Sequence, residues 1–299
     1  MPKTTKQESA ASAGITISKP AHKDSLFRAI YRDEKRAKEL CAATTGIVFS
    51  DNAQVKLCNL ENTIAQRFND IGVAIDGNLL FMCEHQSSIN PNMPLRLLEY
   101  VFQVLFLWFV DRKMLYGEEL VKIPLPQFYV LYNGKSKLAF DTLRLSDAFL
   151  LKGERTDLDL VVHVIDINYE SKGEILEKCD SLNGYAYLIA KIREFKDNGA
   201  SQDKAIANAV RICINEGILT DFLSKENYRE VCDMLFYEYS LEDELAVRGE
   251  QRERKGHQKG LLEAAKKLLC SGMSFEETTS LLGLTDDLVM LLKKAQNEK

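Results

Sequence analysis

The sequence NDIGVAIDGNLLFMCEHQ at residues 69–86 predicts two β-strands joined by a tight turn. Residues 71–75 and 79–83 are short apolar runs, each of the length of a buried strand. The residues between them, Asp76, Gly77 and Asn78, favour a hairpin because Gly and Asn tolerate the positive φ angles of a tight turn. We therefore expect an antiparallel hairpin here.

The hairpin carries polar side chains that suit a metal site. A loop of two or three residues places Asp70 within about one residue of the position opposite Glu84. Side chains alternate along a strand, so Glu84 and Gln86 share one face while His85 points to the other, where we expect it to be buried or paired. Two carboxylates about 5 Å apart at Cα can share a magnesium ion, which takes oxygen ligands.

Spacing alone leaves a simpler alternative open. A carboxylate at the end of a strand is commonly a solvated or capping residue, and Gln86 is an amide that cannot act as a base at neutral pH. In the catalytic interpretation, Gln86 orients the attacking water or hydrogen-bonds a phosphate oxygen.

The residues that follow carry a family resemblance. Residues 84–100, EHQSSINPNMPLRLLEY, resemble the signature of the recombination-promoting nuclease/transposase (Rpn) family, which belongs to the PD-(D/E)XK nuclease superfamily. The resemblance extends over residues 22–28, 69–71 and 123–134, and covers about residues 22–240. It implies an α/β fold with a PD-(D/E)XK restriction-endonuclease-like core, a mixed sheet flanked by helices, followed by an α-helical C-terminal tail.

The resemblance also implies roles for individual residues. Asp70 and Glu84 match the family's two acids, and Gln86 stands where the wider superfamily has Lys. A Gln supplies only a dipole beside the transition state, so we expect slow or conditional cleavage. A Glu on the first helix often approaches the metal in this superfamily; Glu39 is the candidate here, and Glu34 is the alternative.

Three side chains are candidates for contact with DNA. Arg96 and Tyr100 are four residues apart on a helix that begins near Pro94, so they share a face. Arg96 lies close enough in sequence to Glu84 to reach a substrate phosphate, or else it bonds a neighbouring loop. Arg36 belongs to a basic first helix. The net charge of −5 argues against extensive phosphate contact, so local basic patches would have to bind DNA.

Composition limits the class of protein. A chain of 299 residues accommodates one sizeable core and an appendage. Seven cysteines without a CxxC pair indicate neither zinc nor a disulfide framework, which fits a cytoplasmic location. The apolar run at residues 101–110 is far shorter than the ~20 residues of a membrane span, so we expect a core helix and no membrane partner.

The pattern along the chain predicts four parts. They are a disordered tail (1–22), the nuclease domain (23–245), a charged linker (246–259) and a small helix-turn-helix-like unit (260–299). Within the linker, residues 248–259 could instead form a solvated helix. In the nuclease domain we expect a helix at 24–43, strands at 54–58, 127–132 and 159–168, a helix at 94–116, and helices at 172–197, 201–216 and 226–245. In the tail, Ser274 and Glu277 have capping-box spacing, and Gly272 and Gly283 fall at helix ends.

These observations favour a metal-dependent DNA endonuclease that hydrolyses phosphodiester bonds and is associated with DNA recombination or mobile elements. The expected cofactor is Mg²⁺, with Mn²⁺ as a substitute, and the expected partner is DNA; a homodimer is left open. The resemblance implies products with a 5′-phosphate and a 3′-hydroxyl. The alternative is a catalytically weak DNA-binding or protein-interaction module that keeps the nuclease fold, or a regulator that acts through its C-terminal helices.

Overall fold

The computed structural model describes residues 25–58, 70–151, 153, 156–220, 222–224 and 226–297. The chain divides into two compact units, Met1–Phe236 and Tyr237–Lys299, each considered by itself below. The tail expected at residues 1–22 lies outside the described residues.

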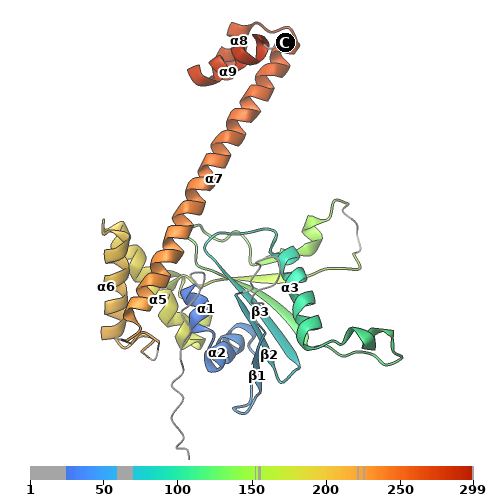
Figure 1. Ribbon diagram of the computed structural model, residues 1–299, viewed down its shortest axis with the longest axis vertical. Coiled ribbons are helices and arrows are strands. Elements are labelled where there is room, and N and C mark those ends of the chain that lie inside the picture. The colour runs from blue at the N-terminus through green and yellow to red at the C-terminus, as the bar shows by residue number, and fades with distance from the viewer. Residues whose placement is uncertain are drawn as a thin grey trace, which may run out of the picture. The chain divides into compact units, whose positions relative to one another are not determined.

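The first unit contains a mixed six-stranded sheet (Figure 1). Its strands, in spatial order, are β1 (Val55–Leu57), β2 (Ile71–Ile75), β3 (Leu79–Gln86), β4 (Leu125–Tyr132), β6 (Val161–Asp166) and β5 (Thr142–Arg144). The pairs β1–β2, β2–β3 and β5–β6 are antiparallel, whereas β3–β4 and β4–β6 are parallel. The α/β class and the mixed sheet flanked by helices are as predicted.

The hairpin predicted from residues 69–86 is confirmed. Asp76 and Gly77 have φ angles of 52° and 65°, and the Asn78 N–H donates to the Ile75 carbonyl at 3.0 Å. Positive φ at both central positions matches the right-handed twist of the strands, and glycine adopts it without strain. The register pairs Ile71 with Cys83, so Asp70 falls one step beyond that pair, opposite Glu84, as expected.

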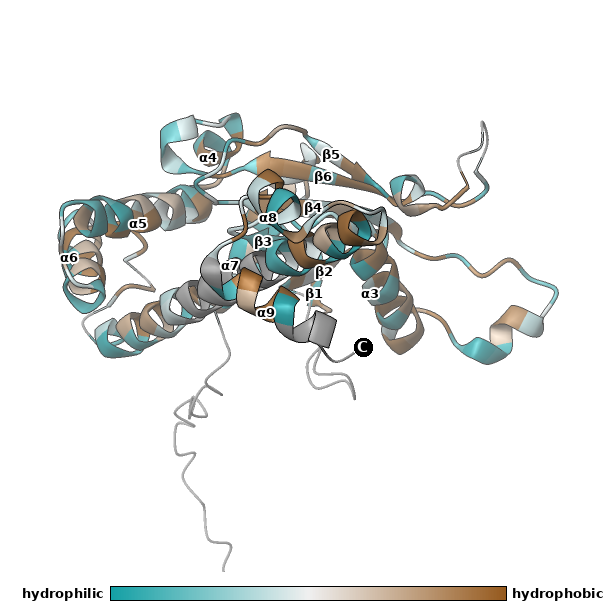
Figure 2. Cartoon of the chain, turned by 90° about the horizontal axis from the view of Figure 1, so that it is seen from above, coloured by the Kyte–Doolittle hydropathy of each residue, from teal (hydrophilic) through white to brown (hydrophobic). Residues whose placement is uncertain are grey.

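Helices cover both faces of the sheet (Figure 1). On one face, α3 (Met93–Trp108) packs Leu97 and Val104 against even-numbered residues of β3 and β4 such as Met82 and Val130. The other face meets α1 (Leu26–Ile30), α2 (Glu34–Thr45) and α5 (Asp180–Asp197). Both β6 and α3 are mostly hydrophobic, as buried layers require (Figure 2).

Two of the expected helices are each divided in the structure. The helix expected at 24–43 ends at Ile30 and restarts at Glu34, because Ser25 and Asp33 each cap a separate helix by accepting a backbone N–H. The helix expected at 172–197 forms α4 (Glu174–Lys178) and α5, which are separated by the extended residue Cys179. By contrast, α6 (Gln202–Asn215) follows its predicted range of 201–216 closely.

The region after β3 also differs in part from expectation. Helix α3 ends at Trp108, and a separate 3₁₀ turn, η1 (Arg112–Tyr116), follows it. Two more 3₁₀ turns occur, η2 (Leu145–Ala148) and η3 (Tyr169–Ser171), and the short edge strand β5 was not predicted. The run 101–110 is only partly a core segment, since Phe102 and Leu107 are more than half exposed.

A glycine after β4 allows close approach to the end of β3. The Asn133 N–H donates to the Gln86 carbonyl at 3.0 Å, which extends the β3–β4 pairing past the last paired residues. A Cβ atom on Gly134 would lie 2.1 Å from the Ser87 carbonyl oxygen and 2.3 Å from the Tyr132 hydroxyl. Only glycine fits here without displacing the backbone that follows Gln86.

The second unit is helical. Helix α7 (Tyr228–Cys270) begins in the first unit and runs continuously through residues 246–259, so the segment expected to be a charged linker is helical. Helices α8 (Phe275–Leu281) and α9 (Asp286–Asn297) follow. The Ser274–Glu277 capping box is confirmed, and Gly272 and Gly283 adopt positive φ angles at the ends of helices as predicted.

Candidate metal centre

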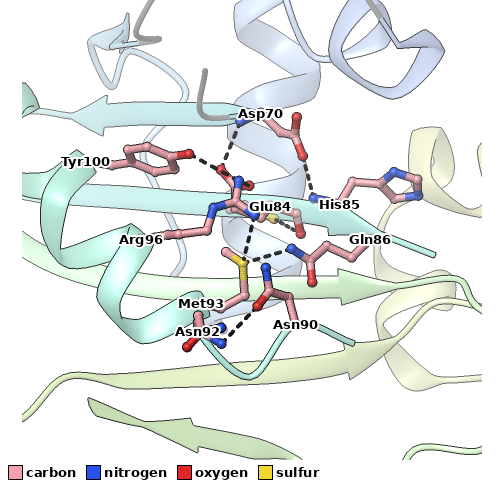
Figure 3. A network of polar contacts seen from close by, with 10 residues as sticks. Asp70, Glu84, His85, Gln86, Asn90, Asn92, Met93, Arg96 and Tyr100 are labelled. Atoms are coloured by element: carbon pink, nitrogen blue, oxygen red, sulfur yellow. Dashed lines mark hydrogen bonds and ion pairs between the residues drawn. The ribbon is translucent and has the colours of Figure 1, made fainter. Parts of the chain in front are cut away.

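Asp70 and Glu84 lie beside each other where β2 begins and β3 approaches its end (Figure 3). The Asp70 N–H donates to Glu84 Oε1 at 3.3 Å. Asp70 Oδ2 accepts the His85 N–H at 2.7 Å, so the backbone of β3 fixes the Asp70 carboxylate. The structure therefore brings together the two acids predicted from the sequence.

The Glu84 side chain is paired with Arg96 of α3. Arg96 Nη2 donates to Glu84 Oε2 at 3.0 Å and to the Tyr100 hydroxyl at 3.1 Å. The Glu84 side chain is only 4 % exposed, whereas the Arg96 side chain is 38 % exposed. Arg96 and Tyr100 share a helix face as predicted, and in this structure they contact the acid pair or each other.

Burial raises the pKa of both carboxyl groups. For Glu84 the loss of hydration is the main cause and the Asp70 charge adds to it; Arg96 opposes both, and the pKa lies well above its ordinary value. For Asp70, burial outweighs the His85 N–H bond and the charges of Arg28 and Arg96. A divalent cation would relieve the repulsion between the two acids.

Gln86 presents a buried oxygen to the same face of β3. Its Nε2 atom donates to Met93 Sδ at 2.8 Å, whereas Oε1 is buried and has no hydrogen-bond partner. Buried polar atoms are nearly always satisfied, so this oxygen is a candidate to accept a hydrogen bond from a ligand water or to contact a cation. With the Gln86 amide oriented in this way, Nε2, which is the only donor of the side chain, donates to the Met93 sulfur.

The donor set fits magnesium. Mg²⁺ prefers oxygen ligands and is commonly held by one or two carboxylates, with water and substrate phosphate completing the shell. Asp70 and Glu84 supply the carboxylates, and the Gln86 oxygen is available for a ligand water. Among the residues the structure describes, no group of three or more His, Cys, Asp and Glu side chains is arranged to hold a metal.

Glu39 is used elsewhere in the fold. Its Oε1 accepts the Asp180 N–H at 2.6 Å and its Oε2 accepts the Ser181 hydroxyl at 2.8 Å, so it caps the N-terminus of α5. Arg36 and Glu39 both line a cavity of about 350 Å³ whose lining includes neither Asp70 nor Glu84. The structure thus does not bring these two candidates to the acid pair.

His85 is a structural residue, as expected. Its ring stacks on Phe27 at 4.5 Å between centroids, and its Nε2 lies 3.2 Å from the Tyr185 hydroxyl. Burial, with a contribution from the Arg193 charge, lowers the pKa of His85 to about 3. The imidazole is therefore neutral at physiological pH and supports the sheet from the face opposite Glu84.

The sequence reasoning did not assign two residues of the site. Arg28, on α1, is only 8 % exposed, and its charge lowers the pKa of both acids. In the sequence, Arg28 differs in no visible way from the other basic residues expected on the first helix. Met93 accepts hydrogen bonds from both Gln86 and Arg96. Its position one residue before Pro94, at the start of α3, is the only sequence signal for its role.

A larger cavity lies at the carboxyl ends of β4 and β6. It has a volume of about 860 Å³ and mixed charge, with Lys135, Lys191, Asp166 and Asp197 in its wall. None of Asp70, Glu84 and Gln86 lines it. Size alone would select this cavity, but the acid pair and the unpartnered Gln86 oxygen lie outside its lining.

The raised pKa of Glu84 gives a prediction about stability. The folded state holds the Glu84 proton to a pH above the ordinary value of 4.5, so wild-type stability falls as pH rises through that window. Glu84→Gln cannot ionise, so its unfolding free energy should rise relative to that of wild type as pH increases from 4 to 8. Thermal unfolding across this pH range, without metal, measures the difference.

Asp159 provides a control of opposite sign. Burial is the largest single cause and raises its pKa, but hydrogen bonds from the Ser146 N–H, Arg144 and the Leu160 N–H together outweigh it, and the pKa is lowered. Asp159→Asn should therefore lose stability above pH 4 and match wild type below it. If Glu84→Gln were less stable than wild type at every pH, Glu84 would be a net stabilising ion-pair partner of Arg96.

Comparisons with known proteins identify no relative. Searches of family models, of curated proteins and of solved structures returned no match to this chain. Within the part of the chain that the structure describes, no helix is long and apolar enough to cross a membrane.

Proposed function

We propose that this chain is a metal-dependent DNA endonuclease of the PD-(D/E)XK type. The observation that carries the proposal is the pair of Asp70 and the buried Glu84 beside the unpartnered Gln86 oxygen, where β2 begins and β3 approaches its end. Two acids with raised pKa values in one buried site are typical of a functional centre rather than of a solvated strand end.

Each residue then has a defined role. Asp70 and Glu84 would hold Mg²⁺, which when bound would supply a Lewis acid and an activated water. The Gln86 amide oxygen would accept a hydrogen bond from such a water and orient it. Arg96, whose side chain is 38 % exposed, would contact the substrate phosphate and supply the positive charge that Gln86 lacks. Tyr100 was a second candidate for DNA contact, but it is only 2 % exposed, so its hydroxyl would instead position Arg96 by accepting a hydrogen bond from it. Phosphodiester hydrolysis in DNA is the reaction proposed for this set.

A second candidate function is a DNA-binding module with little or no cleavage. The specific observation in its favour is the direct Arg96–Glu84 ion pair, which occupies one of the two carboxylates. Together with the amide at position 86, it would slow any reaction that needs both acids.

One experiment separates the two functions. The purified chain is incubated with supercoiled plasmid in Mg²⁺, Mn²⁺ or EDTA, and nicked and linear products are quantified. We expect slow nicking in Mg²⁺ or Mn²⁺ and none in EDTA. A gel shift in EDTA without cutting in either metal would favour the binding module. Cutting that persists in EDTA would exclude the metal mechanism.

A further inference from the structure

We propose that Arg96 acts as an internal counter-cation that competes with the metal for Glu84 and releases it when a DNA phosphate arrives. The inference rests on the proposed function, because it concerns the regulation of the same site. It predicts that metal and DNA bind cooperatively, and that Arg96 is the residue that couples them.

The contact is direct and specific. Arg96 Nη2 lies 3.0 Å from Glu84 Oε2, and Arg96 Nη1 lies 3.4 Å from Met93 Sδ. The Tyr100 hydroxyl accepts from the same Nη2 atom at 3.1 Å, and the Tyr100 ring lies 5.7 Å from the guanidinium carbon. The guanidinium is therefore held against the carboxylate that the metal needs (Figure 3).

Charge balance explains why the two cations compete. Asp70 and Glu84 carry up to two negative charges, and Arg28 and Arg96 already act on both. Adding a divalent ion without moving a guanidinium would leave an excess of positive charge in a poorly hydrated site, where charges interact strongly. The ion and Arg96 would also approach the same Glu84 oxygens.

Exposure determines which partner moves. Glu84 is on a central strand and its side chain is 4 % exposed, whereas Arg96 is on α3 and its side chain is 38 % exposed. Arg96 can thus rotate toward solvent while Glu84 stays in place. A phosphodiester at the mouth of the site offers the planar guanidinium a second anion of matching geometry.

Linkage then fixes the functional consequence. If phosphate withdraws Arg96 from Glu84, DNA must tighten metal binding, and metal must tighten DNA binding by the same factor. Without DNA the site would bind metal weakly, which would limit unproductive loading of the enzyme.

The test measures metal binding, not cleavage. Mn²⁺ binding to the full chain is titrated by electron paramagnetic resonance, with and without a short phosphorothioate duplex that resists hydrolysis. For wild type we expect about tenfold tighter Mn²⁺ binding when the duplex is present. Arg96→Met should bind Mn²⁺ about tenfold more tightly than wild type without DNA, and the duplex should add little.

Three variants keep the result interpretable. Arg96→Lys retains the charge but not the planar fork, so it should bind Mn²⁺ more tightly than wild type and less tightly than Arg96→Met. If Arg96→Met does not fold, the comparison of Arg96→Lys with wild type still tests the inference. Arg144→Met, which removes an ion pair of similar length to Asp159, should match wild type. Glu84→Ala should lose Mn²⁺ binding in all conditions.

The outcomes distinguish this inference from the proposed function. If Glu84→Ala abolishes Mn²⁺ binding but Arg96→Met and Arg96→Lys bind Mn²⁺ no better than wild type, Arg96 is not a competitor and this inference fails alone. If wild type and Glu84→Ala bind Mn²⁺ equally, or neither binds it, the metal site itself is wrong and both fail.

Discussion

Asp70→Ala and Glu84→Ala are each expected to lower the rate of metal-dependent plasmid nicking by at least about 10³-fold. A metal ion stabilises transition-state charge by several kcal/mol, and each 1.36 kcal/mol is a factor of ten in rate. Either alanine removes a carboxylate from a pair that the structure places on adjacent strands. Initial rates at saturating Mg²⁺, measured on supercoiled DNA, give the factor.

Companion variants separate loss of charge from loss of fold. Asp70→Asn keeps an oxygen that can accept the His85 N–H, so it should remain folded while losing cleavage to the same extent. The double alanine variant should be no slower than either single one, because the acids act as a unit. Glu39→Gln tests the third ligand suggested by the resemblance. A full loss of cleavage there would move Glu39 into the metal set, whereas a modest effect would match its role as the α5 cap.

Gly134→Ala is expected to destabilise the first unit by about 3 kcal/mol or more. The added Cβ would lie 2.1 Å from the Ser87 carbonyl oxygen, which is backbone and cannot rotate away. Overpacking typically costs about 1–3 kcal/mol, and a backbone clash this short belongs at or above the upper end. Denaturant unfolding followed by far-ultraviolet circular dichroism measures the change.

The matched control for that change is Gly260→Ala. Gly260 lies inside α7, and a Cβ there meets nothing within 4 Å, so alanine should be neutral or stabilising by about 0.5–1 kcal/mol. Equal stability of wild type and Gly134→Ala would show that the loop after β4 shifts freely. In that case the position of the backbone after Gln86 is not fixed by this contact.

Local rules predicted the hairpin because everything that sets it is close in sequence. The turn residues Asp76 and Gly77 fix the register, and the register places Asp70 opposite Glu84. The strand alternation likewise assigned His85 to the opposite face from Glu84 and Gln86. The capping box of the second unit is another local signal, confined to four residues.

The remainder of the site depends on contacts that sequence spacing does not encode. The Glu39 carboxylate meets Asp180 and Ser181 across some 140 residues, so a helix-surface acid turned out to be a cap. Arg96 was predicted to reach either a phosphate or a neighbouring loop; in the structure it pairs with Glu84, twelve residues away, and the phosphate contact stays a prediction. The break between α1 and α2 was missed because the helical pattern outweighed the capping signal at Asp33.

The His85 peptide joins the site to the core of the sheet. Its N–H holds the Asp70 carboxylate at 2.7 Å, while its ring is enclosed by Phe27 and Tyr185. A change that tilts this ring would also turn the amide that positions Asp70. A genetic screen for inactive alleles would therefore return substitutions at Phe27 and Tyr185 alongside those at the acids, although neither aromatic residue faces the metal side of the sheet.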